Sequence, residues 1–264
     1  MIHWPMAILG AQFFEGEDMR RHASLIFCMG LALAVVGCGD DETGPGGGTG
    51  GTGTGGTGGT GGGAGEMALV TGTVSEAVLE GEPAALGGAM VTVVGGASTT
   101  SNPDGSFEVM APVGTVMFLT TASGAWGSLV ADDVPAGGLT GLEIEVVPDV
   151  LVNAVAGALE TVPDPDKGAV AVSFDDTTVS GDETATIDAT SEISFVFDAA
   201  DDPSEGNTLI PGGGTEVIFF NVEPTNAVTT TASNAINQPC PLEFPAASYS
   251  VQAKVFTDVE VFCP

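Results

Sequence analysis

The chain has 264 residues, with four basic side chains against thirty-five acidic ones, and its formal net charge at pH 7 is −31. Such a surface repels the phosphates of nucleic acids, so the charge argues against nucleic acid as a partner. It also attracts divalent cations and keeps a protein soluble through self-repulsion. The length allows one large domain or two ordinary ones, and the composition changes sharply along the chain.

The N-terminal residues have the pattern of an export signal. Arg20 and Arg21 form a positive segment, and an apolar run over residues 25–36 follows it. The run is too short to cross a bilayer comfortably but has the length of a signal-peptide core. Residues 1–18 place acidic side chains ahead of the positive segment, so Met19 is the better start. We predict an untranslated extension over residues 1–18 and a signal peptide over residues 19–37.

The apolar run ends in Val35-Val36-Gly37-Cys38, which resembles the lipobox of bacterial lipoproteins. The resemblance implies that Cys38 carries more than one acyl chain, which anchors the mature protein stably in a membrane. It also implies export and attachment to the cell envelope, with the outer membrane as the expected location. The alternative is an ordinary signal or short anchor with an incidental cysteine, as Cys28 within the run is.

Residues 38–66 form the predicted lipidated N-terminus and tether. The stretch over 44–65 is almost only glycine and threonine. Because it has no apolar groups to bury, ordering it would cost entropy that nothing offsets. A random coil of this length spans about 26 Å. We therefore predict a disordered spacer that holds the folded region clear of the lipid headgroups.

Alternation of apolar and polar residues begins after the tether and predicts half-buried strands. Leu142, Ile144 and Val146 alternate with glutamates, and Phe107 and Val109 flank another. Turns rich in Gly, Pro and Asp separate the candidates at short intervals. Seven short strands favour an antiparallel sandwich. The other strands predicted here cover residues 68–74, 89–94, 115–121 and 125–130.

Four short motifs occur in this region in a characteristic order. They are Gly72-Thr73-Val74, residues 88–93, Asp104-Gly105-Ser106-Phe107 and Pro112-Val113-Gly114. Together they resemble the carboxypeptidase regulatory-like family. The resemblance implies a transthyretin-like Greek-key sandwich over residues 67–148, acting as a structural or binding module without catalytic residues. The connection over residues 82–86 is longer than the family usually has, which affects a loop.

A helix and a second β region complete the predicted fold. Apolar residues recur at helical spacing over 149–160, after Pro148, and the prolines at 163 and 165 end the pattern. We predict a short helix and linker over residues 149–166 and a second sandwich-like domain over 167–264, interpreted as a diverged copy of the first. The fold class is all-β: one or two small antiparallel Greek-key sandwiches with one short helix between them. The strands predicted in the second region cover residues 168–174, 184–188, 193–198, 215–222, 248–255 and 258–262.

Catalytic chemistry is scarce in this sequence. Both histidines, His3 and His22, precede the predicted cleavage site, and no arginine follows it. The mature chain therefore lacks the imidazole base of most hydrolases and the arginine clamp of phosphoryl-transfer sites. Paired acids such as Asp132-Asp133 could serve a glycosidase, but adjacent acids arise by chance in so acidic a chain. We predict that the protein is not an enzyme.

Three features remain as candidate sites. Cys240 and Cys263 are predicted to form a disulfide, the alternative being two buried thiols, which an oxidising compartment rarely leaves unpaired. Trp126 is a candidate sugar-stacking platform, although a buried aromatic in a strand is the favoured interpretation. A loop with Asp198, Asp201 and Asp202 is a weak candidate for calcium, against a favoured solvated acidic turn. No other cofactor is predicted.

The sequence therefore predicts a non-enzymatic, lipid-anchored envelope protein that acts as a structural or protein-interaction module. Its expected partners are the membrane, through the anchor, and an envelope protein. The alternative is a surface glycan-binding or adhesive module, with calcium assisting.

Overall fold

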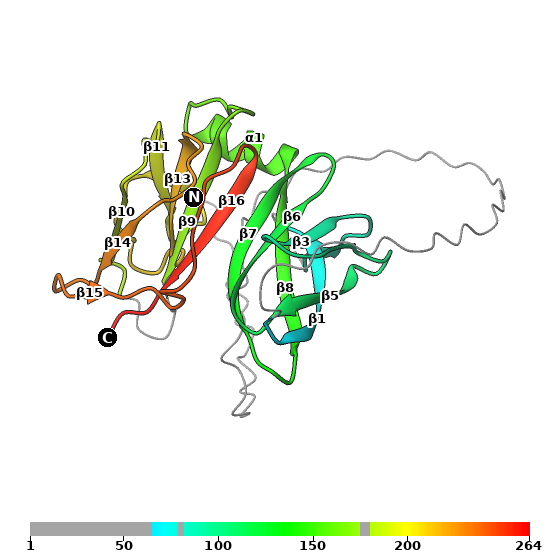
Figure 1. Cartoon of the computed structure of the whole chain (residues 1–264). Coiled ribbons are helices and arrows are strands. Elements are labelled where there is room, and N and C mark those ends of the chain that lie inside the picture. The colour runs from blue at the N-terminus through cyan, green and yellow to red at the C-terminus, as the bar shows by residue number, and fades with distance from the viewer. Residues whose placement is uncertain (1–64, 79–81, 175–179) are drawn as a thin grey trace, which may run out of the picture.

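The computed structural model in Figure 1 describes residues 65–78, 82–174 and 180–264. The predicted extension, signal peptide, lipidation site Cys38 and almost all of the tether lie outside the described residues. Within the described part the chain is nearly all β, with one helix. The all-β prediction is therefore confirmed, including a single short helix between two β regions.

Strands β1 to β8 precede the helix α1, and β9 to β16 follow it. The first group is β1 Met67–Glu76, β2 Ala84–Ala85, β3 Met90–Val93, β4 Ser98–Thr100, β5 Ser106–Pro112, β6 Gly114–Thr121, β7 Ala125–Val134 and β8 Leu139–Pro148, with α1 at Asp149–Ala158. The second group is β9 Gly168–Phe174, β10 Thr184–Ile187, β11 Ile193–Phe197, β12 Pro203–Glu205, β13 Glu216–Val222, β14 Thr230–Ser233, β15 Pro239–Cys240 and β16 Val255–Val261.

Three layers of strands make up the structure. One layer, the β1 sheet, has β1 paired with β2, β5 and β8, and β8 also pairs with β7 at Ala125 and Trp126, which joins this layer to the second. The second layer, the long sheet, runs in the order β12-β11-β13-β9-β16-β7-β6-β3-β4. The third layer, the β10 sheet, has the order β10-β14-β15. Most pairs are antiparallel, but β1 with β8, β16 with β7 and β16 with β9 are parallel.

The first sandwich closes the β1 sheet over β3, β6 and β7. Every second residue of the facing strands enters a common core, as Val70, Phe107, Phe118 and Ile144 do. Gly72 is required here, because a Cβ would lie 2.1 Å from the backbone oxygen of Leu142 and 2.8 Å from the ring of Phe107. The Asp104-Gly105 turn also behaves as its sequence indicates, with Gly105 at a φ of 79°.

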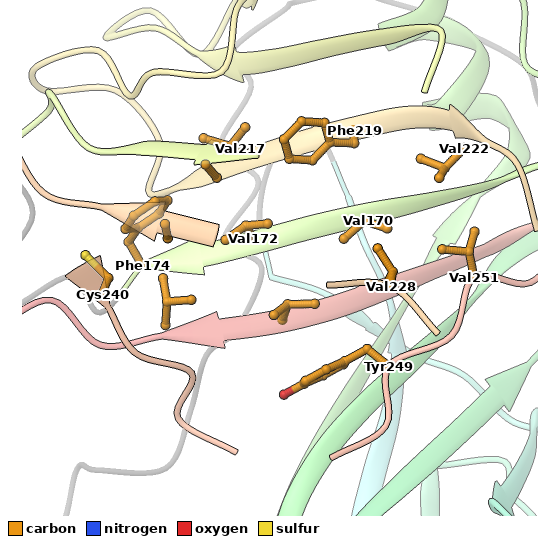
Figure 2. Packing of buried hydrophobic residues seen from close by; sticks show 14 of the residues in the cluster. Val170, Val172, Phe174, Val217, Phe219, Val222, Val228, Cys240, Tyr249 and Val251 are labelled. Atoms are coloured by element: carbon orange, nitrogen blue, oxygen red, sulfur yellow. The ribbon is translucent and has the colours of Figure 1, made fainter. Parts of the chain in front are cut away.

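The second half packs the long sheet against the β10 sheet on one face and against α1 on the other. Figure 2 shows the first of these cores, where Val170, Phe219 and Tyr249 gather from β9, β13 and the segment before β16. On the opposite face, Leu151 and Val155 of α1 cover Ile218 and other residues of the long sheet. Alternation along β9 and β13 thus serves two cores at once.

The two halves share one sheet, which the sequence did not reveal. β16, drawn in red in Figure 1, lies beside β7, and residues Val255 to Thr257 pair with Gly127 to Leu129. Side chains on the outer face of the first sandwich, such as Met117 and Leu129, therefore belong to the core of the second half. The long sheet is continuous from β4 to β12.

One predicted strand is wrong. Residues 248–255 alternate in burial as a strand would, with Tyr249 and Val251 buried, but before Val255, where β16 begins, they form only an isolated bridge between Val251 and Thr225. Lys254 has a φ of 55°, in the left-handed region, which breaks the extended backbone before β16 begins. The predicted alternation of burial was correct, but the predicted strand was not.

Candidate interaction face and buried carboxylate seam

The outer face of the β1 sheet has an apolar end. Leu69 lies opposite Met110 across the β1/β5 ladder, and Met67 lies opposite Pro112. Met67, Leu69 and Met110 are 46%, 45% and 43% exposed, and Val113 after β5 is 38% exposed. We call Met67, Leu69, Met110 and Val113 the apolar patch. Alternation puts the strand neighbours of Leu69 and Met110 in the core, so β1 and β5 expose large apolar groups on the side that a sandwich normally keeps polar.

A hollow of about 550 Å³ adjoins this patch along β1 and β5. Its lining is rich in hydroxyl groups, and Glu108 is its carboxylate. Phe107 forms part of the floor but is buried, so no aromatic face is available for stacking. We call it the threonine hollow, and its lining residues are Thr71, Gly72, Thr73, Thr99, Thr100, Asn102, Ser106, Phe107, Glu108 and Gly141.

Buried and half-buried carboxylates gather where the two halves meet, and we call the group Glu145, Glu216, Asp258 and Glu260 the carboxylate seam. Ser173 on β9 holds two of them together: its Oγ donates to Oδ1 of Asp258 over 2.7 Å and lies 3.4 Å from Oε1 of Glu216. Asp258 is only 8% exposed, and Oε2 of Glu145 is buried without a hydrogen-bond partner. Four acids from three strands thus share one poorly hydrated region.

Removal from water raises every pKa in the seam, because burial penalises the charged form. Burial, reinforced by the charge of Glu143, raises the pKa of Glu145 to about 7. Burial and the charge of Asp258 raise the pKa of Glu216 to about 8. Burial also raises the pKa values of Asp258 and Glu260, the latter further through Asp258, and Ser173 only partly offsets the effect at Asp258.

No basic side chain of the described residues neutralises the seam. Lys167 pairs with Glu223 at 3.1 Å, and Lys254 pairs with Asp149 at 2.9 Å. The second ion pair also places a negative side chain in the first turn of α1, where the helix dipole favours it. Both described lysines therefore fix connections around α1, while the seam stays without a cation from the protein.

Cys240 and Cys263 form the predicted disulfide, with Cα atoms 4.3 Å apart and both side chains buried. The bond ties the short strand β15 to the residues after β16. It closes the end of the second core, to which both cysteines belong. This prediction is confirmed.

Trp126 does not provide an exposed stacking surface. It is 2% exposed, and its ring stacks on Phe220 with centroids 5.3 Å apart and lies 5.6 Å from Phe256. The expectation of a sugar platform at Trp126 is corrected here, because the strand that carries it is covered by the second half of the chain. The apolar space beside it under α1 holds a cavity of only about 20 Å³, room for about one water molecule.

The acidic loop after β11 is organised by its first residue. Oδ1 of Asp198 accepts hydrogen bonds from the backbone N–H groups of Ala200 and Asp202, and Asp201 takes a left-handed φ of 59°. These contacts define a tight turn between β11 and β12. Among the residues that the structure describes, no group of three or more His, Cys, Asp or Glu side chains is arranged to hold a metal ion. The calcium prediction for Asp198, Asp201 and Asp202 stays a prediction.

Glu183 is a buried charge that the sequence analysis missed. Its carboxylate accepts hydrogen bonds from the N–H and hydroxyl of Ser180 and from the N–H groups of Gly181 and Asp182, at 2.7 to 3.0 Å. Burial acts to raise the pKa of Glu183, but these hydrogen bonds outweigh it and hold the pKa below its usual value. The Ser-Gly-Asp-Glu sequence, with small residues before an acid, was the available signal.

Comparison with known proteins leaves the family open. No protein-family model and no curated protein matches the chain. Among solved structures, it is similar to the shaft pilin SpaA of Lactobacillus rhamnosus GG, at 12% identity over 75% of this chain and 97% of that one, with a TM-score of 0.24. A DUF3823 family protein of Parabacteroides merdae matches at 13% identity over 64% and 90% of the two chains, with a TM-score of 0.25.

A streptococcal ancillary pilin matches at 11% identity over 75% of this chain and 62% of that one, with a TM-score of 0.24. Resemblances at this level are too loose to assign a family or a function. The fold itself defines the class of protein, a β-sandwich with an added β region on a shared sheet. In the described part of the chain no helix is long and apolar enough to cross a membrane.

Proposed function

We propose that this protein is a non-enzymatic, lipid-anchored component of the bacterial cell envelope that binds another envelope protein through the outer face of the β1 sheet. The apolar patch carries the proposal. It groups four partly exposed apolar side chains, three on the paired strands β1 and β5 and Val113 directly after β5. Of the other exposed large apolar residues, Met90 and Val94 lie at the two ends of β3, and Val150, Val162, Ile236 and Phe262 lie apart in the chain. A grouped patch of this kind marks a protein interface more often than scattered residues do.

Position in the chain supports the same face. The predicted anchor is Cys38, the tether ends near residue 65, and the patch begins at Met67. The tether therefore delivers the apolar end of the β1 sheet closest to the membrane, within reach of proteins embedded in it or bound to it. The disulfide agrees with an exported protein, because such bonds persist in oxidising compartments.

Charge narrows the kind of partner. The chain has a net charge of −31, and Glu66 and Glu108 are exposed beside the patch. An anionic lipid surface or a second copy of this chain would be repelled. The complementary partner is a protein with an apolar patch rimmed by Lys and Arg, which would gain both burial and attraction.

The absence of an enzymatic role rests on what the described side chains already do. Trp126 and the disulfide are part of the core, both described lysines are ion-paired, and Asp198 organises a turn. Of the seam carboxylates, Asp258 is buried and the others are half-buried, and none of them lines the threonine hollow. This arrangement of side chains is compatible with a binding role.

Photo-crosslinking in intact cells tests the proposal. A photo-reactive residue replaces Leu69 in one strain and Val162 in another, since both are exposed apolar positions and only the first belongs to the patch. The expected result is one discrete adduct from position 69 that disappears when Met67→Ser and Met110→Ser are added, and no such adduct from position 162. The same adducts at both positions, or none at 69, would contradict the proposal.

A second candidate, binding of a surface glycan, is favoured by the threonine hollow. Its hydroxyl and amide groups match the hydrogen-bonding needs of sugar hydroxyls, and its volume suits one or two rings. A glycan array probed with and without calcium tests it, with Thr71→Val and Thr73→Val as the variant. Binding that this variant abolishes supports the candidate, and an array without any binding in either condition eliminates it.

A further inference from the structure

The ladder that joins the two halves stops where the carboxylates begin. β7 and β16 pair over three residues each, ending with Thr257 opposite Leu129. β7 itself continues to Val134 in its ladder with β6, while β16 continues beside β9. Beyond this last pair, Asp258 comes next on β16, and Glu260 on β16 and Asp132 on β7 each lie three positions past it. The long sheet therefore divides beyond Leu129 and Thr257, next to these carboxylates, and we call this point the fork.

The groups that face this fork, among the residues that the structure describes, are acidic or neutral. β16 contributes Asp258 and Glu260, β13 contributes Glu216, and β9 contributes the hydroxyl of Ser173. β8 contributes Glu145 and Glu143, and β7 contributes Asp132. The segment before β16 contributes Glu243 and Tyr249, whose charges or hydroxyl lie close enough to interact with the seam. The two described lysines are engaged with Glu223 and Asp149 instead.

Contacts inside the seam show how closely its carboxylates are packed. The hydroxyl of Ser173 donates to Oδ1 of Asp258 over 2.7 Å and lies 3.4 Å from Oε1 of Glu216, so one small donor serves two acids. Oε2 of Glu145 is buried without a hydrogen-bond partner. The seam therefore holds more carboxylate oxygens than it has donors to satisfy them, which favours protonated carboxyl groups.

We infer that the carboxylate seam is a proton-operated latch: protonated, it holds β16 and the second half against β7 and β8, and ionised, it drives the fork open. The inference is independent of the proposed function. Repulsion between like charges at these buried and half-buried positions is screened less than at an exposed surface, and the ladder that opposes it is only three residue pairs long between β7 and β16. In the β1 sheet only β8 carries a seam residue, Glu145, and its ladder with β1 is longer.

The direction of the effect follows from the raised pKa values. A carboxyl group whose pKa is higher in the folded state contributes stability that is complete below its ordinary pKa of about 4 and is lost as the pH rises through the folded value. For Glu145 and Glu216 those folded values are about 7 and about 8. The latch is therefore closed in mildly acidic surroundings and open in mildly alkaline ones.

Amide hydrogen exchange of the intact mature protein at pH 6 and pH 9, corrected for the intrinsic rate, tests the inference. We expect protection to fall at least about tenfold more over residues 255–261 and 125–129 than over β1 and β5, as protons leave the seam. The variants Glu216→Gln and Glu260→Gln, which keep shape and remove charge, should reduce this difference. Exposed Glu108→Gln on β5 and Glu205→Gln on β12 are the matched controls and should leave it unchanged.

Two results would overturn the latch. One is a uniform loss of protection across all strands at pH 9, which would indicate global destabilisation without a specific opening at the fork. The other is an unchanged difference in the glutamine variants. Should a glutamine variant fail to fold, the regional comparison in the wild-type protein still decides, because it requires no substitution.

Discussion

Trp126 on β7 stacks on Phe220 on β13, with ring centroids 5.3 Å apart, so an aromatic contact joins the two halves beneath α1. Replacing Trp126 by Ala removes the largest fully buried side chain of the described residues. We expect the free energy of unfolding to fall by about 3 to 5 kcal/mol, and by less for Trp126→Phe. Chemical denaturation followed by circular dichroism checks this, and a loss below about 1 kcal/mol would mean that the halves do not depend on this contact.

Trp126 also reports on the junction. It is the only tryptophan after the predicted cleavage site, since the other is Trp4. If the halves unfold together, the fluorescence of Trp126 and the far-ultraviolet circular dichroism of the strands should give one coincident denaturation curve. Two separated transitions would show that the halves fold independently despite their shared sheet.

Thermal stability should pass through a maximum at mildly acidic pH. On the alkaline side, stability declines as the pH rises through about 7 and 8, where Glu145 and Glu216 lose their protons in the folded state. On the acid side, the depressed pKa of Glu183 contributes stability that is lost as the pH falls below its ordinary value of 4.5. A Tm series from pH 3 to pH 9 measures both limbs. A Tm that rises steadily from pH 5 to pH 9 would contradict the seam assignments.

Asn221 is expected to be intolerant of substitution. It is buried with a φ of 51° at an irregularity in β13, and its amide donates to the backbone oxygen of Val162 and to Oε2 of Glu192. It also accepts a hydrogen bond from the N–H of Asp164, so it fixes the linker after α1. Asn221→Ala should cost about 2 to 4 kcal/mol, because it leaves buried groups unpaired and keeps the strained φ. Denaturation of this variant beside Asn153→Ala, on the exposed face of α1, makes the comparison.

The disulfide should stabilise the second half in particular. Cys240 and Cys263 are 23 residues apart in sequence, and closing a loop of that length contributes about 3 kcal/mol through the unfolded state. Replacing both cysteines with serine, or reducing the bond, should lower the stability by about that amount. It should also expose the β14 and β15 region to protease first. Equal stability of the oxidised and reduced proteins would show that the disulfide does not stabilise the fold.

Local patterns in the sequence were sufficient for most strands. The alternation in β1, β5, β8 and β9 is set by burial on one face, and α1 begins at Asp149 as the helical spacing after Pro148 predicted. The shared sheet could not be inferred in this way. β16 joins β7 over residues that lie more than a hundred positions apart, and periodicity carries no information about which strand lies beside which.

The candidate sites show the same difference between local patterns, which could be predicted, and long-range contacts, which could not. The cysteine pair could be predicted because composition and compartment restrict it. Glu145 alternates with Ile144 and Val146 as a solvent-facing residue would. It belongs to the carboxylate seam only because Glu216 and Asp258 of the second half pack close to it. The favoured interpretation of Trp126 as a core residue was right for the same reason that the sugar platform was wrong: the second half covers that end of β7.

Cell fractionation with protease treatment of intact cells, comparing the wild-type protein with Cys38→Ala, tests whether Cys38 anchors the protein in the cell envelope. We expect the wild-type protein to sediment with membranes and the variant, which has no thiol to acylate at position 38, to be released into the soluble fraction. Cleavage of the wild-type protein by added protease would place it on the cell surface, and protection would place its partner on the inner side. A Cys38→Ala protein that still sediments with membranes would contradict the lipid anchor.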